Sequence, residues 1–196
     1  IAIANACLPA EHLNNMRDGY HCDAFTHFAM QRAERNDVST VFIAFNTWWF
    51  SAHPLECPSV DWECVGSISV DDADRLFLQD FSDRIGKLRM KGKRVIISLP
   101  FPIYDKSIPD LLIRNAVFGR MGPATAAHDI AAPELREKLL DVARAAGADV
   151  FDPRKSLCDS RGCITQLQGV SIYKDDNHLA ASQLGLLEAN LRQALE

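Results

Sequence analysis

Residues 38–45, which run from Val38 to Phe45, constrain the fold more than any other stretch of the chain. Almost all of their side chains are apolar or β-branched, without the alternation of a strand that has one face in water. A run of this kind is typical of a strand buried on both faces of a parallel sheet. The stretch therefore predicts an α/β fold, with helices covering the sheet.

The rest of the chain alternates further strands with helices. Short apolar runs predict strands at residues 1–6, 95–99 and 148–151. Apolar residues at three- and four-residue steps, with Gly92 and two prolines at helix ends, predict helices at 23–36, 71–91, 109 onward, 133–147 and 179–195. Residues 51–70 are expected to be irregular. This order predicts a mostly parallel sheet, and 196 residues suit a single domain.

The composition is that of a soluble globular protein and excludes several functions. Hydrophobic residues make up 47% and charged residues 24% of the chain. A net charge of −5 gives no electrostatic basis for binding nucleic acid. No apolar run approaches the ~18 residues of a membrane span, and residues 1–6 resemble a buried strand more than a signal peptide.

Six cysteines fall into three sequence-local couples, and local disulfides are the simplest interpretation. The couples are Cys7/Cys22, Cys57/Cys64 and Cys158/Cys163. Disulfides imply an oxidising compartment. The alternative is a zinc site that recruits Cys7, His12, His21 and Cys22. Neighbouring His21 and Cys22 are poorly placed for tetrahedral ligation, and the chain has no Cys-x-x-Cys, so disulfides are favoured over metal.

Polar residues follow three of the predicted elements and are candidates for chemistry, because functional groups gather at the carboxyl ends of parallel strands. They are Asn46 to Trp49, Ser98, and the stretch that holds Asp175 and His178. A carboxylate three residues before an imidazole can orient it as a proton acceptor. The competing interpretation is that Asp175, Asp176 and Asn177 cap the closing helix.

The stretch Tyr173-x-Asp175-x-x-His178-Leu179, preceded by a cysteine-bounded loop and Gly169, resembles the last block of the SGNH (GDSL-like) hydrolase superfamily. It is most similar to the extracytoplasmic SGNH domain fused to membrane acyltransferases of the acyltransferase-three family, which modify cell-surface polysaccharides. Cys7-Leu8-Pro9 and the Leu157-Cys158 pair fit the same pattern.

This resemblance implies a three-layer α/β/α, flavodoxin-like fold and a Ser-His-Asp mechanism that needs no cofactor and no metal. His178 would be the general base and Asp175 its partner. Asn46 lies where the family places its oxyanion donor, although Asn also suits a simple turn.

Three tryptophans lie near the presumed site. Trp48 is a candidate for stacking on a sugar ring, with Trp62 nearby in the sequence, whereas Trp49 is expected to pack under the long loop.

The chain departs from the family at the nucleophile. The family places this Ser in a Gly-Asp-Ser motif after its first strand, and none occurs in these 196 residues. That strand would be central, between residues 1–6 and 38–45, so we expect an N-terminal segment outside this sequence to complete the sheet. Ser98 is the weaker alternative nucleophile.

The expected function is O-acylation, most simply O-acetylation, or deacylation of a cell-surface polysaccharide. A membrane acyltransferase domain would deliver the acyl group, and the location would be periplasmic or extracellular, with tethering to the inner membrane through an upstream domain. Two rivals stay open, a non-catalytic carbohydrate-binding or interaction module and a free-standing secreted esterase.

Overall fold

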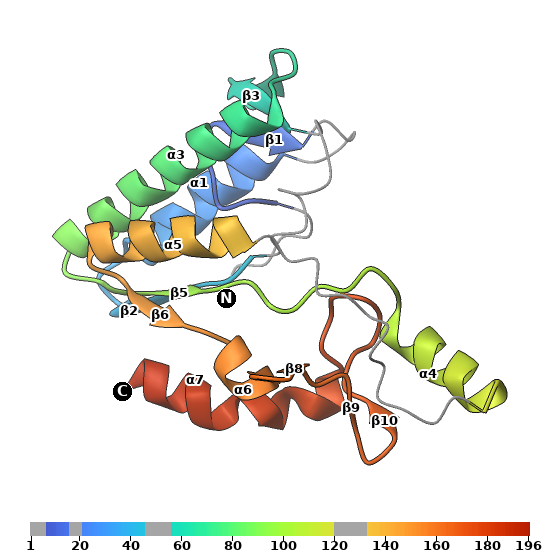
Figure 1. Ribbon diagram of the computed structural model, residues 1–196. Helices are drawn as coiled ribbons and strands as arrows, with labels where there is room; N and C mark the ends of the chain where they lie inside the picture. The colour runs from blue at the N-terminus through green and yellow to red at the C-terminus, as the bar shows by residue number, and fades with distance from the viewer. Residues whose placement is uncertain (1–6, 16–20, 46–55, 120–132) are drawn as a thin grey trace. The chain divides into compact units, whose positions relative to one another are not determined.

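The computed structural model describes residues 7–15, 21–45, 56–119 and 133–196 (Figure 1). The chain divides into two compact units, which are described separately. The first unit comprises Ile1–Leu99 and Ala132–Val150, and the second comprises Pro100–Ala131 and Phe151–Glu196. The single domain predicted from the sequence stays a prediction. No helix in the described ranges is long and apolar enough to cross a membrane.

A parallel sheet forms the centre of the first unit and confirms the predicted fold class. Strand β2 (Thr40–Ile43) pairs in parallel with β5 (Arg94–Ser98), and the strand order is β2-β5-β6, with β6 at Asp149–Phe151. The middle residues of β5 are completely buried, as expected for an apolar strand at the centre of such a sheet. The predicted strand at residues 1–6 lies outside the described residues.

Helices α1 (Cys22–Ala33), α3 (Val70–Met90) and α5 (Pro133–Ala146) belong to the same unit. Helix α3 begins at Ser69, whose hydroxyl accepts a hydrogen bond from the Asp72 N–H at 3.1 Å. Gly92 follows its end with a φ of +74°, a left-handed conformation that favours glycine. Helices α3 and α5 contact each other (Figure 1). The three helices predicted in this unit therefore agree with the structure to within a few residues.

The apolar core of the first unit forms between these helices and the sheet. Its largest side chains come from the buried face of α3 at three- and four-residue steps, from β5, and from α5. They include Phe77, Phe81, Ile85, Leu88, Val95, Ile97, Leu135 and Leu139.

A small antiparallel sheet corrects the expectation that residues 51–70 are irregular. Strand β1 (Leu13–Asn15) pairs with β3 (Glu56–Val60), which turns back into β4 (Glu63–Cys64). The connecting residues Asp61 and Trp62 both have positive φ, as a two-residue type I′ turn requires. The sequence hid this hairpin, because Pro58 lies within a strand and the turn lacks the usual Asn-Gly.

The second unit is built from short elements. They are α4 (Ile108–Val117), α6 (Arg154–Leu157), the hairpins β7 (Cys158–Asp159) with β8 (Gly162–Cys163) and β9 (Gln166–Leu167) with β10 (Val170–Ser171), the 3₁₀ helix η1 (Ala181–Leu187) and α7 (Glu188–Leu195). The single helix expected at 179–195 is therefore wrong in its first half. Gly185 lies in the 3₁₀ segment, and glycine disfavours an α-helix.

Three disulfides join the cysteines as the three sequence-local couples. They are Cys7–Cys22, Cys57–Cys64 and Cys158–Cys163. The first uses two residues of the alternative zinc site, which the structure therefore does not form.

Candidate functional site

The Asp175–His178 turn of the second unit is shaped by the Asp175 side chain. Its Oδ1 accepts hydrogen bonds from the backbone N–H groups of Asn177, at 3.0 Å, and His178, at 2.8 Å. Aspartate favours such turns because its short side chain reaches the amides that follow it. The next helical segment, η1, has Ala180 at its N-cap. The helix-cap interpretation of Asp175 is therefore wrong, because this carboxylate closes a turn instead.

The same carboxylate holds the His178 ring. His178 Nδ1 lies 2.8 Å from Asp175 Oδ2 and 3.1 Å from Oδ1. Because a carboxylate only accepts hydrogen bonds, Nδ1 carries the proton and Nε2 is the nitrogen with a lone pair. The His178 side chain is 64% exposed and that of Asp175 is 37% exposed. The pair thus has the geometry of a general base with its orienting acid, open to water.

Backbone contacts hold the turn in place on both sides. The Lys174 N–H donates to the His178 carbonyl at 2.8 Å, and Tyr173 forms an isolated antiparallel bridge with Leu179. From the segment before α4, the Tyr104 N–H donates to the Asp176 carbonyl at 2.9 Å. The Tyr173 ring is buried and meets Tyr104 edge to face at 5.1 Å. A turn anchored in this way can present a side chain in a fixed orientation.

The electrostatics of Asp175 favour its ionised form. Desolvation is the largest single influence and acts to raise the pKa of this carboxyl. The hydrogen bonds from the Asn177 and His178 backbone, together with the His178 ring, outweigh it and lower the pKa below the ordinary value. Asp175 therefore remains a carboxylate at neutral pH, as an orienting acid must.

The other predicted site residues have different outcomes. Asn46 and Trp48 lie outside the described residues, so their proposed roles stay predictions. Ser98 is buried, and its hydroxyl donates to the Leu99 carbonyl at 3.1 Å. A buried hydroxyl that is already engaged is poorly suited to attack a substrate.

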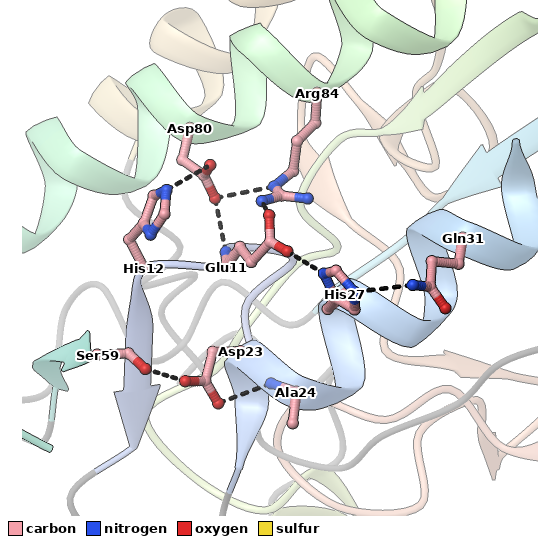
Figure 2. Close-up of polar contacts among 9 residues, drawn as sticks. All are labelled: Glu11, His12, Asp23, Ala24, His27, Gln31, Ser59, Asp80 and Arg84. Carbon is pink, nitrogen blue, oxygen red and sulfur yellow. Dashed lines mark hydrogen bonds and ion pairs between the residues drawn. The ribbon is translucent and has the colours of Figure 1, made fainter. Parts of the chain in front are cut away.

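A cluster of ionisable side chains in the first unit was missed from the sequence (Figure 2). We call Glu11, His12, His27, Asp80 and Arg84 the ionic cluster. Arg84 Nε lies 3.0 Å from Asp80 Oδ2, which also accepts from the Glu11 N–H at 2.6 Å. Glu11 contacts both Arg84 and His27 through its carboxylate. His12 Nε2 lies 4.0 Å from Asp80 Oδ1.

Burial shifts the pKa of two members of this cluster, Asp80 and Arg84. It raises the pKa of Asp80 to about 6, an effect that His12 opposes, and it lowers the pKa of Arg84 to about 10. A sequence signal was present, because Asp80 and Arg84 lie four residues apart on the same face of α3 as Phe77, Phe81 and Leu88. Charged residues within a core-facing stripe indicate a buried pair.

No group of three or more histidine, cysteine or acidic side chains within the described ranges could hold a metal ion.

Comparison with known proteins gives two matches of different kinds. The sequence model for the SGNH domain fused to AT3 domains matches residues 1–193. Among solved structures, the chain is similar to the periplasmic domain of a lipopolysaccharide acetyltransferase of Salmonella ser. Paratyphi A, with a TM-score of 0.70 and 15% identity. That match covers 95% of this chain and 68% of the other, and it shows the fold alone. The comparison with curated proteins found no match.

Proposed function

The chain belongs to the family of SGNH domains fused to AT3 domains, and from this premise we propose that it is the extracytoplasmic part of a polysaccharide O-acyltransferase or esterase. Membership supports an enzyme of acyltransferase or esterase type in general, and the three disulfides support an extracytoplasmic location. The observation that carries the finer proposal is the contact of both Asp175 oxygens with His178 Nδ1.

In the first half-reaction, His178 Nε2 removes the proton from a serine hydroxyl as its oxygen attacks the acyl carbonyl of the donor. A tetrahedral intermediate forms, and collapses when the protonated His178 returns the proton to the leaving group. The products are an acyl-serine ester and the deacylated donor. Asp175 keeps the ring in the productive tautomer and stabilises the transient imidazolium.

In the second half-reaction, a sugar hydroxyl attacks the acyl-serine ester. His178 removes the hydroxyl proton and then delivers it to the serine oxygen, which restores the enzyme and leaves an O-acyl sugar. Water in place of the sugar gives the esterase reaction. The simplest acyl group is acetyl. An amide at Asn46 would stabilise the oxyanion in both steps, and Trp48 would contact the sugar.

The nucleophile in this proposal lies on a segment outside these 196 residues, because they contain no Gly-Asp-Ser. Beside strand β2 lies a groove of about 640 Å³ that is lined mainly by apolar side chains of α1 and β2. An apolar groove of this kind supports the docking of a further segment of the protein in it.

We propose that the acyl donor is delivered by a membrane acyltransferase domain, to which this domain is tethered. The fusion to AT3 domains in the family name supports this arrangement.

The experiment replaces His178 by Ala in the complete protein and measures the turnover of p-nitrophenyl acetate. We expect the rate to fall by about 10³-fold or more, because the serine then lacks its base. Lys174→Ala, at an exposed position in the same turn, serves as the control and should keep the parent rate. Turnover near the parent level in the His178→Ala protein would exclude the proposed role of His178.

A non-catalytic carbohydrate-binding module is the second candidate, and the missing Gly-Asp-Ser is the observation that favours it. The encoded residues upstream of Ile1 discriminate the two candidates. A Gly-Asp-Ser within about 30 residues, the length of one strand–helix unit, supports the enzyme, and its absence supports the binding module. Hydrophobic spans further upstream would exclude a free-standing secreted esterase.

A further inference from the structure

The tip of the β3–β4 hairpin places a tryptophan where small residues are favoured. Trp62 has a φ of +68° and follows Asp61, with a φ of +50°. In a two-residue turn of this kind, Gly or Asn normally occupies the second position, and a bulky residue with positive φ is an outlier. Backbone strain of this type concentrates at functional sites. The Trp62 ring therefore requires a reason other than the turn.

The hairpin is braced so that the ring has a defined position. The Cys57–Cys64 disulfide links the two strands. The buried Asn14 side chain donates to the Trp62 carbonyl at 3.3 Å, and His21 Nδ1 donates to the same oxygen at 3.1 Å. A side chain on such a support loses little conformational entropy when it binds a ligand.

The Trp62 side chain is exposed beside two polar groups. It is 44% exposed, and its ring meets that of His27 edge to face, with 5.4 Å between the centroids. Gln31 Nε2 lies 2.8 Å from His27 Nε2 on the same exposed side of α1. Both ring nitrogens of His27 are engaged, Nδ1 by Glu11 and Nε2 by the Gln31 amide, so His27 positions Gln31. An aromatic face next to a side-chain amide can contact both the C–H groups and the hydroxyls of a sugar.

Glu11, which is itself paired with the buried Arg84, holds His27 in position (Figure 2). Glu11 contacts His27 Nδ1, and Arg84, whose side chain is only 6% exposed, contacts Glu11. Burying such a charged group is costly. Here it fixes a partly exposed histidine next to an exposed tryptophan, an arrangement expected of a preorganised binding surface.

We propose that Trp62, His27 and Gln31 form a binding platform for a pyranose ring of the glycan acceptor. This inference rests on the proposed function, because it assigns the acceptor of that reaction to a surface. The platform accepts the flat C–H face of a sugar on Trp62, while the Gln31 amide, held in place by His27, binds its hydroxyls. The residues before and after Trp62 in the chain, Asp61 and Glu63, are exposed and acidic and favour a neutral glycan over an anionic one.

The test uses Trp62→Asn and Trp62→Phe in the complete protein. Asn removes the ring but tolerates the left-handed backbone, so this variant should fold with a melting temperature no lower than that of the parent. Phe keeps an aromatic face in the same conformation. Val65→Ala changes another exposed apolar residue near the hairpin, 55% exposed, and serves as the control.

Three readouts are compared: p-nitrophenyl acetate turnover, O-acetyl content of the cell-surface polysaccharide by NMR, and retention of the protein on immobilised, de-O-acetylated polysaccharide. In the Trp62→Asn protein, we expect retention and O-acetylation to fall by about tenfold, with turnover of the small ester unchanged. The Phe and Val65→Ala proteins should stay within about threefold of the parent.

The outcomes separate this inference from the proposed function. If the parent protein turns over the ester and Trp62→Asn matches the parent in retention and O-acetylation, the platform is excluded while the enzyme stands. If the parent has no turnover but is retained, and Trp62→Asn is not, the platform stands and the enzyme is excluded. A parent that is not retained excludes the platform.

Discussion

Replacing Arg84 by Met tests whether the ionic cluster is held together by charge. The Arg84 side chain is 6% exposed and lies 3.0 Å from Asp80, which is 8% exposed. Methionine keeps most of the apolar stem, so the change mainly removes the cation. Breaking a buried pair in this way costs about 3–5 kcal/mol of stability, because the remaining charge is left uncompensated.

Without Arg84, the buried Asp80 can avoid an unpaired charge by taking up a proton. The free energy of protonating it is therefore an upper limit on the loss of stability, and this limit depends on pH. An aspartate in the unfolded chain has a pKa of about 3.9, so protonating it at about pH 7.5 costs about 5 kcal/mol, at about 1.36 kcal/mol for each pH unit. At about pH 5.5 the same limit is about 2 kcal/mol. Since burial has already raised the pKa of Asp80 to about 6, the loss of Arg84 matters less below that pH.

Urea unfolding of the parent and Arg84→Met proteins, followed by tryptophan fluorescence with the disulfides oxidised, measures this difference. We expect a loss of about 3–5 kcal/mol near pH 7.5 and of less than about 2 kcal/mol near pH 5.5. Arg75→Met is the control, because Arg75 lies on the same helix in an exposed pair with Asp72 and should change little at either pH. A penalty in Arg84→Met that is the same at both pH values would refute the reasoning.

Two further predictions concern a helix cap and the Asp175–His178 turn. Ser69→Ala should lower the free energy of unfolding by about 1 kcal/mol, because Ser69 caps α3. Ser107→Ala is the control at the start of α4, where the side chain makes no cap hydrogen bond, and it should cost clearly less. Equal losses of stability for the two variants in thermal melts would contradict the capping role of Ser69. Asp175→Asn in the complete protein should reduce p-nitrophenyl acetate turnover by about 10³- to 10⁴-fold, because the amide no longer fixes the productive tautomer of His178. Asp176→Asn is the matched control. Equal rates in the two variants would exclude the orienting role of Asp175.

Elements with a strong local pattern were predicted well from the sequence. The buried strand β5 follows from a continuous apolar run and the helix α3 from its apolar periodicity, with Gly92 after its end. The β3–β4 hairpin was missed because it pairs with β1, more than forty residues earlier in the chain. Local sequence carries no signal for partners of that kind.

The candidate site was likewise predicted only in part from the local sequence. Asp175 and His178 were identified from their spacing and from a family motif, but whether they cap a helix or close a turn depended on the rest of the second unit. The Tyr104 and Ile108 N–H groups bind the carbonyls of Asp176 and Asp175 and hold the chain in the turn. The sequence gives no sign of the contacts of His12 and His27, because their partners lie elsewhere in the chain, as for His27 and Glu11, 16 residues apart.

The sequence by itself determined the α/β class, the family, the cysteine couples and the Asp175–His178 pair, because each rests on residues that are close together or on a periodicity that a short segment carries. Tertiary structure alone decided which carboxylates are buried, which histidines they bind, and that Trp62 stands exposed on a braced turn. These features depend on groups as far apart as Glu11 and Arg84, which are 73 residues distant in the chain. Folding brings them together, and only then do desolvation and charge pairing act on them.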